Sequence, residues 1–374
     1  MEKPAPGSDD NLHPVPLEEE FEYSNNRVQS NVYRTKEDRE AVKALEKFLL
    51  GTQKNLTSKE IIEQTGATLP LVSKIWHALG IPDISENEVY FTEADVKGLK
   101  KVTELTDKHG LDFETTISIA RSMGQLTDRI VAWQIEEIVD DISRQQGFSN
   151  GRARQELLKV LPELITTLQE ILSYTYRRQY NAGVLRLALR NEDGVSEDRA
   201  DLPLLRGIGF IDLVSYTTLS CQMNEKTLGK LVKTFEQRCA EIIAIGGGRI
   251  IKTVGDEVLF LTETPDAAAR ISLALSQAIE EHPDLPHTRV AFVWGRILPK
   301  LGDVYGPTVN LASRLVSIAE PGKVLTNDAT AQTLKGDGRF RFTPQPKRNV
   351  RGFGDITPIS VEVGTGNELE IDTE

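Results

Sequence analysis

The chain contains little cysteine, no long apolar run and no excess of basic residues. Its two cysteines, Cys221 and Cys239, are too few among 374 residues for a disulfide framework or a four-ligand zinc site. No stretch approaches the ~20 apolar residues of a membrane-spanning helix. Residues 1–16 lack the basic-then-apolar plan of a signal peptide. We therefore expect a cytoplasmic protein with reduced thiols and no membrane partner.

The charge balance is acidic throughout. The formal net charge is −12, and both residues 1–200 and the remainder are net negative. Neither half carries the basic footprint that nucleic acid binding requires, so a nucleic acid partner is unlikely. Hydrophobic residues make up 39% of the chain and charged residues 27%, which is typical of a globular protein. The length favours two domains over one.

Composition and periodicity predict five segments. Residues 1–30 hold four of the 17 prolines and scattered acids, which predicts a flexible tail. Apolar residues recur at helical spacing through residues 31–190, which predicts an all-α domain. Residues 191–201 are polar and contain a glycine turn signal, so we assign them to a linker. Residues 202–365 alternate strand and helix patterns, and residues 366–374 form an acidic tail.

The second domain has a β-α-β-β-α-β-α-β pattern, which predicts an α+β sandwich of ferredoxin-like plan. A Gly-first two-residue loop at Gly255-Asp256 predicts a tight β-hairpin between two strand-like segments. The strands are expected at 208–214, 249–254, 257–262, 288–294 and around Val324 and Ile359, and the helices from about 225, at 265–281 and at 308–319.

Two acids stand where a rigid sheet can present them. Asp212 ends an apolar strand and Asp256 lies at the hairpin tip, so the two carboxylates approach each other if those strands are neighbours. At ~4 Å and an effective dielectric of ~20 their repulsion is roughly 4 kcal/mol, and such a pair needs a cation. Mg²⁺ or Mn²⁺ with a phosphate substrate fits. The alternative is that both acids are ordinary turn and cap residues.

Three further polar residues interrupt apolar patterns. Lys252 lies inside an apolar strand, where it either has a binding role or faces solvent from an edge strand. Asn310 and Arg314 are four residues apart, so they share one face of the helix at 308–319, away from its apolar stripe. That polar face is either functional or plain solvated surface.

The segments Phe210–Thr217, Ile251–Asp256 and Asp303–Arg314 resemble, in order and spacing, the three signature blocks of class III nucleotidyl cyclases. The resemblance covers residues 202–365, and the joint occurrence of all three blocks is highly specific. It extends to soluble actinobacterial adenylate cyclases, in which a helical regulatory domain precedes the catalytic domain.

The resemblance implies that Asp212 and Asp256 hold two Mg²⁺ or Mn²⁺ ions per site. It also implies that Lys252 and Asp303 read the adenine ring. A lysine donor and an aspartate acceptor match N1 and N6 of adenine, whereas guanine leaves both mispaired. ATP is therefore the expected substrate, converted to 3′,5′-cyclic AMP and pyrophosphate. A guanylate cyclase is the first alternative.

By the same resemblance, Asn310 positions the ribose and Arg314 stabilises charge on the reacting phosphate. Arg351 aligns with a lysine of the family that touches the terminal phosphates, and Thr217 is implied to bind substrate. All the site residues are present in one chain, as in the subclass that forms homodimers. The implied homodimer has two equivalent sites at the subunit interface, each combining residues of both chains.

The sequence departs from the family pattern at two places. Ser215 and Tyr216 stand where Gly and Phe are usual, and residues 295–303 are shorter than the usual dimerisation arm. The shorter arm bears on the dimer geometry more than on the chemistry.

Residues 56–105 of the helical domain resemble a MerR-like helix-turn-helix. Thr57 and Glu60 form a capping-box pattern, Pro70 opens a second helix, and residues 89–91 fit a wing strand. The segment is net acidic, which favours a regulatory or protein-contact role over DNA binding. A DNA-binding regulator whose cyclase-like domain senses nucleotide is the second alternative.

His77 and His109 lie in this domain, and an ordinary histidine titrates near pH ~6.5. We therefore hypothesise that acidification relieves an inhibition by the helical domain. The alternatives are that both are packed or solvated side chains, or that a regulatory ligand of this domain carries the signal.

Overall fold

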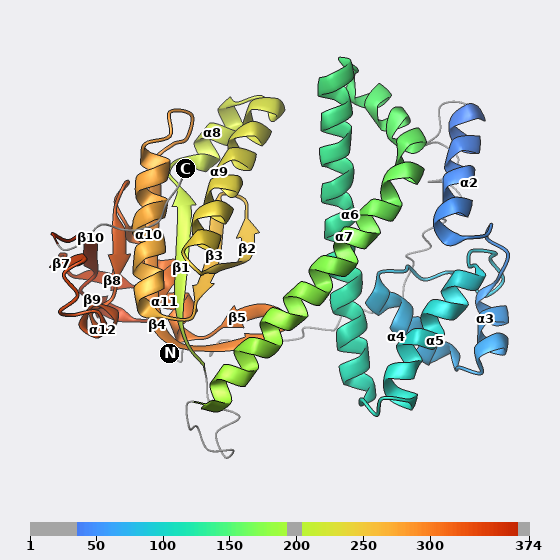
Figure 1. Ribbon diagram of the computed structural model, residues 1–374, viewed down its shortest axis with the longest axis horizontal. Helices are drawn as coiled ribbons and strands as arrows, with labels where there is room; N and C mark the ends of the chain where they lie inside the picture. The colour runs from blue at the N-terminus through green and yellow to red at the C-terminus, as the bar shows by residue number, and fades with distance from the viewer. Residues whose placement is uncertain (1–35, 193–203, 366–374) are drawn as a thin grey trace, which may run out of the picture. The chain divides into compact units, whose positions relative to one another are not determined.

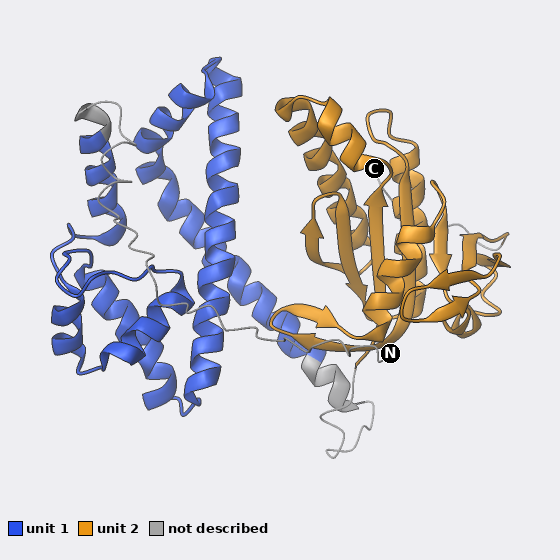
Figure 2. Cartoon of the chain, turned by 180° about the vertical axis from the view of Figure 1, so that it is seen from behind, with its two compact units in different colours: residues 1–189 blue, residues 190–374 orange. Residues whose placement is uncertain are grey.

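The computed structural model describes residues 36–192 and 204–365. The chain divides into two compact units, residues 1–189 and 190–374 (Figure 2). The tails at 1–30 and 366–374 and most of the linker at 191–201 lie outside the described residues. Asn191 and Glu192, which the sequence assigned to the linker, are the last two residues of a long helix instead.

The N-terminal unit consists of helices, as its apolar spacing predicts (Figure 1). They are α2 (Lys36–Leu50), α3 (Ser58–Thr65), α4 (Leu69–Leu79), α5 (Glu93–Asp107), α6 (Phe113–Gln146) and α7 (Asn150–Glu192). No helix in the described ranges is long and apolar enough to cross a membrane.

Side-chain caps fix the start of the helix pair. Thr57 accepts a hydrogen bond from the Glu60 N–H at 3.3 Å, and the Glu60 carboxylate accepts one from the Thr57 N–H at 2.7 Å. This capping box confirms the predicted start of α3. The predicted wing strand is wrong. Phe91 makes one isolated bridge to Leu56, because Thr92 already caps α5 at the next residue.

Helix α4 packs closely on α6. A Cβ at Gly124 of α6 would lie 2.7 Å from the Ala78 carbonyl oxygen of α4, so the two backbones meet only because residue 124 is glycine. Trp76 of α4 stacks on Phe91 with ring centroids 4.1 Å apart, inside the core of this unit. The second helix of the predicted helix-turn-helix is therefore covered along one face by α6.

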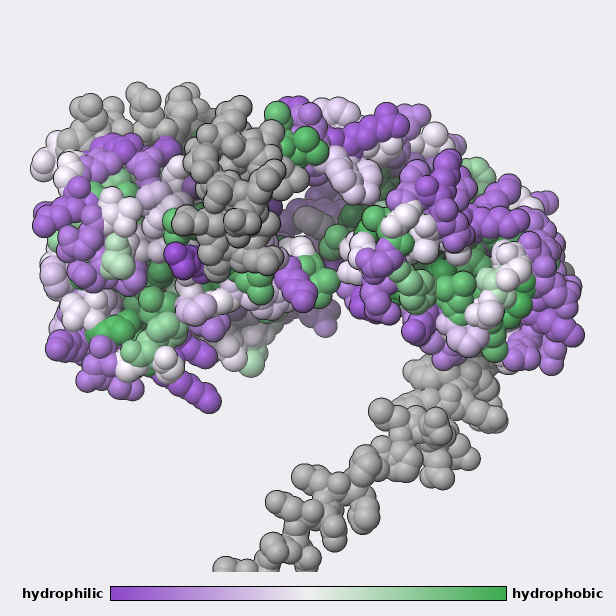
Figure 3. All heavy atoms as spheres, turned by 90° about the horizontal axis from the view of Figure 1, so that it is seen from below, coloured by the Kyte–Doolittle hydropathy of each residue, from purple (hydrophilic) through white to green (hydrophobic). Residues whose placement is uncertain are grey.

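Helices α6 and α7 share a second, smaller core near their connection, formed by Val139, Ile142, Ala153 and Leu157. Away from that core, both helices carry exposed apolar or aromatic side chains, such as Trp133 and Tyr174. Figure 3 shows hydrophobic residues reaching the surface among hydrophilic ones on the face drawn there.

The C-terminal unit is built on a mixed sheet with strand order β2-β3-β1-β4-β6-β10-β7. Neighbouring strands are antiparallel except β4 and β6, which are parallel. The strands are β1 (Leu204–Leu213), β2 (Arg249–Val254), β3 (Glu257–Thr262), β4 (Thr288–Lys300), β5 (Asp303–Tyr305), β6 (Val324–Thr326), β7 (Phe340–Pro344), β8 (Arg348–Val350), β9 (Gly354–Ile356) and β10 (Ile359–Val363).

Helices cover both faces of this sheet. Helices α9 (Glu225–Ile245) and α10 (Pro265–Glu280) bury their apolar stripes on one face, together with Ile211 and Phe260. Helix α11 (Pro307–Ile318) covers the other face, where Ala312 and Leu315 pack on Phe210. The predicted α+β class and ferredoxin-like plan are confirmed, because β1-α9-β2-β3-α10-β4 forms the expected core order.

The structure adds elements that the sequence pattern missed. They are α8 (Tyr216–Gln222), α12 (Asp328–Thr333), the strand β7, the short β8–β9 hairpin and β5. Strand β4 also runs six residues past its predicted end at 294 and pairs with β5, forming a hairpin arm with Leu298 opposite Tyr305. Ser215, before α8, has a left-handed φ of 62°, which favours glycine.

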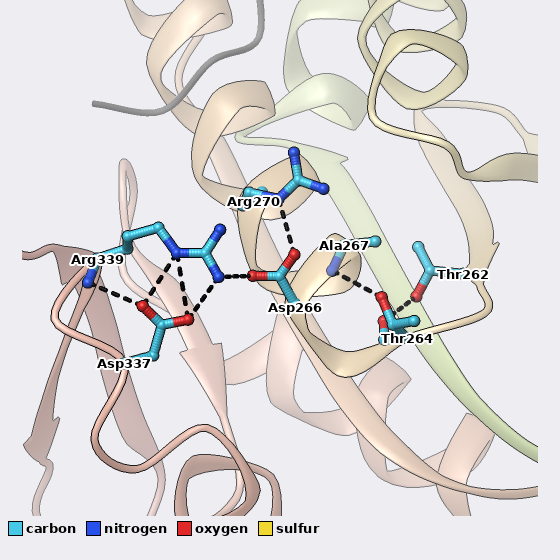
Figure 4. A network of polar contacts seen from close by, with 7 residues as sticks. All are labelled: Thr262, Thr264, Asp266, Ala267, Arg270, Asp337 and Arg339. Atoms are coloured by element: carbon cyan, nitrogen blue, oxygen red, sulfur yellow. Dashed lines mark hydrogen bonds and ion pairs between the residues drawn. The ribbon is translucent and has the colours of Figure 1, made fainter. Parts of the chain in front are cut away.

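A charged network anchors the loop before β7 to the start of α10 (Figure 4). Arg339 donates hydrogen bonds to the carboxylates of Asp337 and Asp266, and Arg270 donates to Asp266 at 3.0 Å. Asp266 lies in the first turn of α10, where a negative charge is favourable. The network therefore ties edge strand β7 to α10 through the loop that precedes the strand.

Candidate active site

The structure brings Asp212 and Asp256 together. Strand β1 pairs with β3, so Asp212 lies near the end of β1 beside the β2–β3 turn that holds Asp256. Gly255 has a φ of 63° in that turn, and this left-handed conformation lets two residues close the hairpin. The two carboxyls share a hydrogen bond. The predicted approach of the two acids is confirmed.

Their proximity changes the chemistry of Asp212. Burial, the hydrogen bond with Asp256 and the negative charges of Asp256 and Glu257 together raise the pKa of the Asp212 carboxyl to about 7. Arg289, whose Nη1 lies 3.9 Å from Asp212 Oδ2, acts in the opposite direction. This half-buried pair of acids is an oxygen-rich place for a cation.

Lys252 and Asp303 contact each other directly. Lys252 Nζ donates a hydrogen bond to Asp303 Oδ2 at 2.5 Å, and the Val304 N–H donates to Asp303 Oδ1 at 2.8 Å. Burial raises the pKa of Asp303, but these hydrogen bonds outweigh burial and hold the pKa below its usual value. The two residues proposed to read one base therefore form one unit before any base is bound.

A β-bulge decides where Lys252 points. Ile250 pairs with Phe260 and Lys252 with Leu259, so Ile251 is an extra residue in β2. Phe260 belongs to the core under α9 and α10, whereas Leu259 belongs to the core under α11. An uninterrupted strand would put Ile250 and Lys252 on the same face. The bulge places Lys252 on the α11 face. Asp212 shares this face because it follows Phe210, which packs under α11, by two residues.

Asn310 and Arg314 lie on the exposed side of α11, opposite its buried stripe. Their side chains make no hydrogen bond or ion pair within the described part of the chain, although the Arg314 carbonyl accepts a bond from Ser317. No polar contact in the described ranges joins either residue to Asp212 or Asp256. The structure thus presents them on the same sheet face as the acids without bringing them into contact.

Thr217 and Arg351 are both exposed and lie in separate segments of the chain. Thr217 is in the first turn of α8, directly after β1, and Arg351 lies in the turn between β8 and β9. No side-chain contact in the described residues ties either one to the other site residues. Their roles stay predictions.

Sequence reasoning missed two residues of this site. Register places Glu257 of β3 and Arg289 of β4 on either side of Asp212. Burial raises the pKa of Glu257, and the charge of Asp256 adds to this. The Nε of Arg289 is buried without a hydrogen-bond partner in the described residues. In both cases the sequence offered one signal, a charged residue at the beginning of a mainly apolar strand.

Two further observations concern the carboxylates available to a cation and the position of a nearby groove. In the described ranges no group of three or more His, Cys, Asp or Glu side chains is arranged to hold a metal ion, so the protein offers two carboxylates there. A groove of about 710 Å³ lies between α9 and α10, lined in part by Arg238, Glu241 and His282. It contains none of the residues above, because α9 and α10 cover the opposite sheet face.

Comparison with known proteins identifies the family. A family model described as the adenylate and guanylate cyclase catalytic domain matches residues 287–362, which include Asp303, Asn310, Arg314 and Arg351. An adenylate cyclase from Glutamicibacter nicotianae is 49% identical over 343 residues, covering 89% of this chain and 85% of that relative. The chain belongs to the adenylate cyclase family. This cyclase is also 34% identical over 341 residues to an adenylate cyclase from Streptomyces coelicolor, covering 84% of this chain and 87% of that one.

The solved structures similar to this cyclase include the adenylyl cyclase CyaB from P. aeruginosa. The two are 22% identical, and the match covers 42% of this cyclase and 93% of the solved chain with a TM-score of 0.39. The identification as an adenylate cyclase rests on the full-length relatives. The choice of ATP over GTP as substrate and the likeness of α3 and α4 to MerR proteins stay predictions.

Proposed function

We propose that this cyclase converts ATP to 3′,5′-cyclic AMP and pyrophosphate at two sites formed between two copies of the chain. Asp212 and Asp256 would hold the catalytic Mg²⁺ or Mn²⁺ ions, and the N-terminal unit would regulate turnover. The observation that carries the proposal is that two adjacent carboxyls and the ion-paired Lys252–Asp303 unit lie on the sheet face that α11 covers, and that α11 exposes Arg314, which has no ion pair within the described residues.

The acids fit a divalent cation. Two carboxyls that share a hydrogen bond, with the pKa of Asp212 raised to about 7, are poorly stabilised without a positive charge. Mg²⁺ and Mn²⁺ prefer oxygen ligands and take a few carboxylates together with substrate phosphates, which suits a site of two carboxylates. Bound ions would lower the pKa of the ribose 3′-hydroxyl and neutralise the charge of the triphosphate.

In this reaction the protein residues would act mainly by positioning the base, the ribose and the phosphates. The ribose 3′-hydroxyl gives up its proton to solvent water, a bond forms between the 3′-oxygen and the α-phosphorus, the bond from that phosphorus to the bridging oxygen breaks, and pyrophosphate leaves. Lys252 and Asp303 would fix the adenine edge, and Asn310 would orient the ribose so that attack is in line. Arg314 would offer its planar fork of donors to charge that develops on the phosphate. Arg351 and Thr217 would bind the phosphates.

The proposal uses two copies because a single chain keeps Arg314 and the Asp212–Asp256 pair apart. Within the described residues, Arg314 has no anionic partner, and the Asp212–Asp256 pair has only Arg289 nearby, at 3.9 Å. A two-fold arrangement would bring the cationic half of one copy to the acidic half of the other and form two equivalent sites.

The β4–β5 arm supports the same arrangement. Leu298 and Tyr305 are cross-strand partners and are 56% and 47% exposed, and Leu301 at the tip is 73% exposed. The arm, short as it is, therefore presents apolar side chains to the surroundings. A second copy would remove this apolar surface from water.

Regulation by the N-terminal unit is favoured over DNA binding. Lys74, the only Lys or Arg of α4, lies over the Phe113 ring of α6 at 5.5 Å. A helix that reads DNA needs cations on its free face to contact phosphates, and α4 offers no other Lys or Arg. The helix pair is better suited to contacts with protein or a regulatory ligand.

Subunit mixing tests the proposal. Arg314→Ala and Asp256→Ala should each abolish most turnover alone. Mixing them lets each heterodimer form one site with an intact Asp256 from one chain and an intact Arg314 from the other. At equal amounts about a quarter of the original sites should return, since half of the dimers are mixed and each has one working site.

The matched control mixes Arg314→Ala with Asn310→Ala. Both substitutions lie in the same half-site, so every site in that mixture stays damaged. Subunit exchange is verified with two affinity tags. A mixture of Arg314→Ala and Asp256→Ala that stays inactive after exchange, or that recovers no more than the control, would show that the sites are not shared.

A further inference from the structure

In addition to its apolar packing on the sheet, helix α11 is tied to strand β4 by the hydroxyl of one buried residue. Thr308 lies in the first turn of α11, is 9% exposed, and donates a hydrogen bond from Oγ1 to the Arg296 carbonyl oxygen of β4 at 2.6 Å. The residue before the helix, Gly306, offers no side-chain cap. The hydroxyl of Thr308 therefore connects the beginning of the helix to the strand beneath it.

Strand β4 is shaped to accept this residue. A Cβ at Gly295 would lie 2.6 Å from Thr308 Oγ1 and 3.2 Å from its Cγ2, distances too short for normal contact. The glycine thus leaves room for the threonine to lie directly on the strand backbone. The hydrogen bond and this close approach are independent features, and both fix the same turn of α11.

The position of α11 determines where two polar side chains point. Asn310 and Arg314 follow Thr308 by two and six residues, and within the described part of the chain neither side chain has a partner that would orient it. The position of the helix backbone therefore sets the region that each side chain can reach. A displacement of about 1 Å at a reacting group can cost about 100-fold in rate.

We propose that Thr308 is a positioning residue for the cyclase reaction, holding α11 on β4 so that Arg314 meets the reacting phosphate of a substrate bound partly by the other copy. The inference rests on the role of Arg314 in the proposed function. Thr308 itself is buried under the helix and acts through Arg314 and Asn310.

Strand β4 offers a matched control. Thr326 of β6 is fully buried and donates from Oγ1 to the Phe292 carbonyl oxygen of the same strand at 2.7 Å. It has the same chemistry and the same acceptor strand as Thr308, but no site residue follows it on a helix. Any effect of losing a buried threonine hydrogen bond as such should appear equally at both positions.

The experiment compares Thr308→Val, Thr308→Ser and Thr326→Val in the full chain. Thr308→Val should lower kcat by about 10-fold to 100-fold while KM for ATP changes by less than about threefold, because the lost alignment matters in the transition state. Thr308→Ser keeps the hydroxyl and should retain kcat within about threefold. Thr326→Val should lower the thermal unfolding midpoint as much as Thr308→Val does, with kcat unchanged.

Two further variants separate the possible failures. Gly295→Ala, which would displace Thr308, should reproduce the kcat loss of Thr308→Val. Adding Thr308→Val to Arg314→Ala should cause no further loss, since the two residues act as one unit. An active Arg314→Ala enzyme would refute the proposed function. If Arg314→Ala is inactive but Thr308→Val keeps its kcat, or Thr326→Val loses as much, the positioning role is refuted.

Discussion

Two aspartates of the site are perturbed in opposite directions by their surroundings. Asp212 is half-buried against Asp256 and Glu257, and its pKa is raised to about 7. Asp303 is paired with Lys252, and its pKa is lowered. The first carboxyl opposes folding of the metal-free protein once it ionises, whereas the second supports folding once it ionises. The contrast gives each residue a pH signature of its own.

Asp212→Asn should stabilise the metal-free protein above neutral pH. Between the usual aspartate pKa near 3.8 and about 7, the unfolded chain loses a proton that folded Asp212 keeps. Stability of the wild type therefore falls as pH rises through this window, and the asparagine variant lacks that fall. Thermal unfolding in EDTA from about pH 4.5 to 8.5, which brackets the window, should show the variant's advantage growing with pH. A difference independent of pH would contradict the assigned environment.

Asp303→Asn is the contrasting variant. Because the folded pKa of Asp303 is lowered, its contribution is present above the unfolded value and is lost as pH falls through the folded one. Replacing this carboxyl should therefore lower the unfolding midpoint at neutral pH, and the deficit should shrink on acidification. The two variants should show opposite signs at neutral pH.

Base choice is a second property that we expect single residues to set. The test is the double variant Lys252→Glu, Asp303→Asn. It puts a hydrogen-bond acceptor at residue 252, where adenine N1 needs a donor, and an amide donor at residue 303, where adenine N6 needs an acceptor. ATP turnover should fall by about 10-fold to 100-fold and the relative use of GTP should rise, because specificity is the difference between paired and mispaired edges. Competition assays with both nucleotides measure it. An unchanged ATP preference would show that other residues read the base.

At the scale of elements, some site residues are placed by local backbone conformation and others by the packing of one strand on the next. The hairpin turn at Gly255-Asp256 is specified locally, whereas the bulge at Ile251 depends on how β2 fits against β3. The start of α8 is a third case. Ser215 has a left-handed φ of 62° at the position where the family pattern usually has glycine. This serine carries a conformational cost that glycine would not.

Ser215→Gly should raise the free energy of unfolding by about 1 kcal/mol, because it removes the left-handed strain of a residue with a Cβ. Ser220→Gly is the matched control, since Ser220 lies inside α8 and replacing serine by glycine there should cost about 0.5 kcal/mol. Urea unfolding of both variants measures the two values. Equal destabilisation by the two substitutions would contradict the strained conformation of Ser215.

At the scale of the whole molecule, the proposed catalysis and its proposed control belong to separate units. Each unit has hydrophobic cores of its own, and the proposed chemistry uses residues of the C-terminal unit alone. In the N-terminal unit, His77 Nε2 lies 2.7 Å from Asp83 Oδ1, so protonation of this histidine would complete an exposed ion pair. His109 follows α5 and is exposed as well.

The fragment 200–374 should be more active than the full chain near neutral pH, by about 5-fold or more if the coupling is of ordinary size. Acidification should narrow the gap, because added positive charge on the acidic N-terminal unit shifts the balance between inhibited and released states. Activity ratios from about pH 5.5 to 8 test this, with the double variant His77→Gln, His109→Gln as control. Ratios that stay flat, or that respond equally in the variant, would exclude these histidines.

The sequence by itself determined the features that depend on neighbours along the chain. The capping box of Thr57, the hairpin turn at Gly255-Asp256 and the apolar stripes of α9 and α11 follow from local spacing, and each formed as predicted. The nearness of Asp212 to Asp256 followed from one further assumption, that β1 lies beside the hairpin. Turn geometry and helical periodicity act over a few residues, which is why they can be read from the sequence.

Only the tertiary structure decided which distant residues share the site. Arg289 lies beside Asp212 because β1 and β4 pair in one register, and Lys252 faces α11 because a bulge shifts the register of β2. Lys252 and Asp303 are 51 residues apart in sequence and bind each other through the arm that β4 and β5 form. A shift of one residue reverses the face of every side chain in a strand. Register is set by packing of the whole sheet, so no local pattern specifies it.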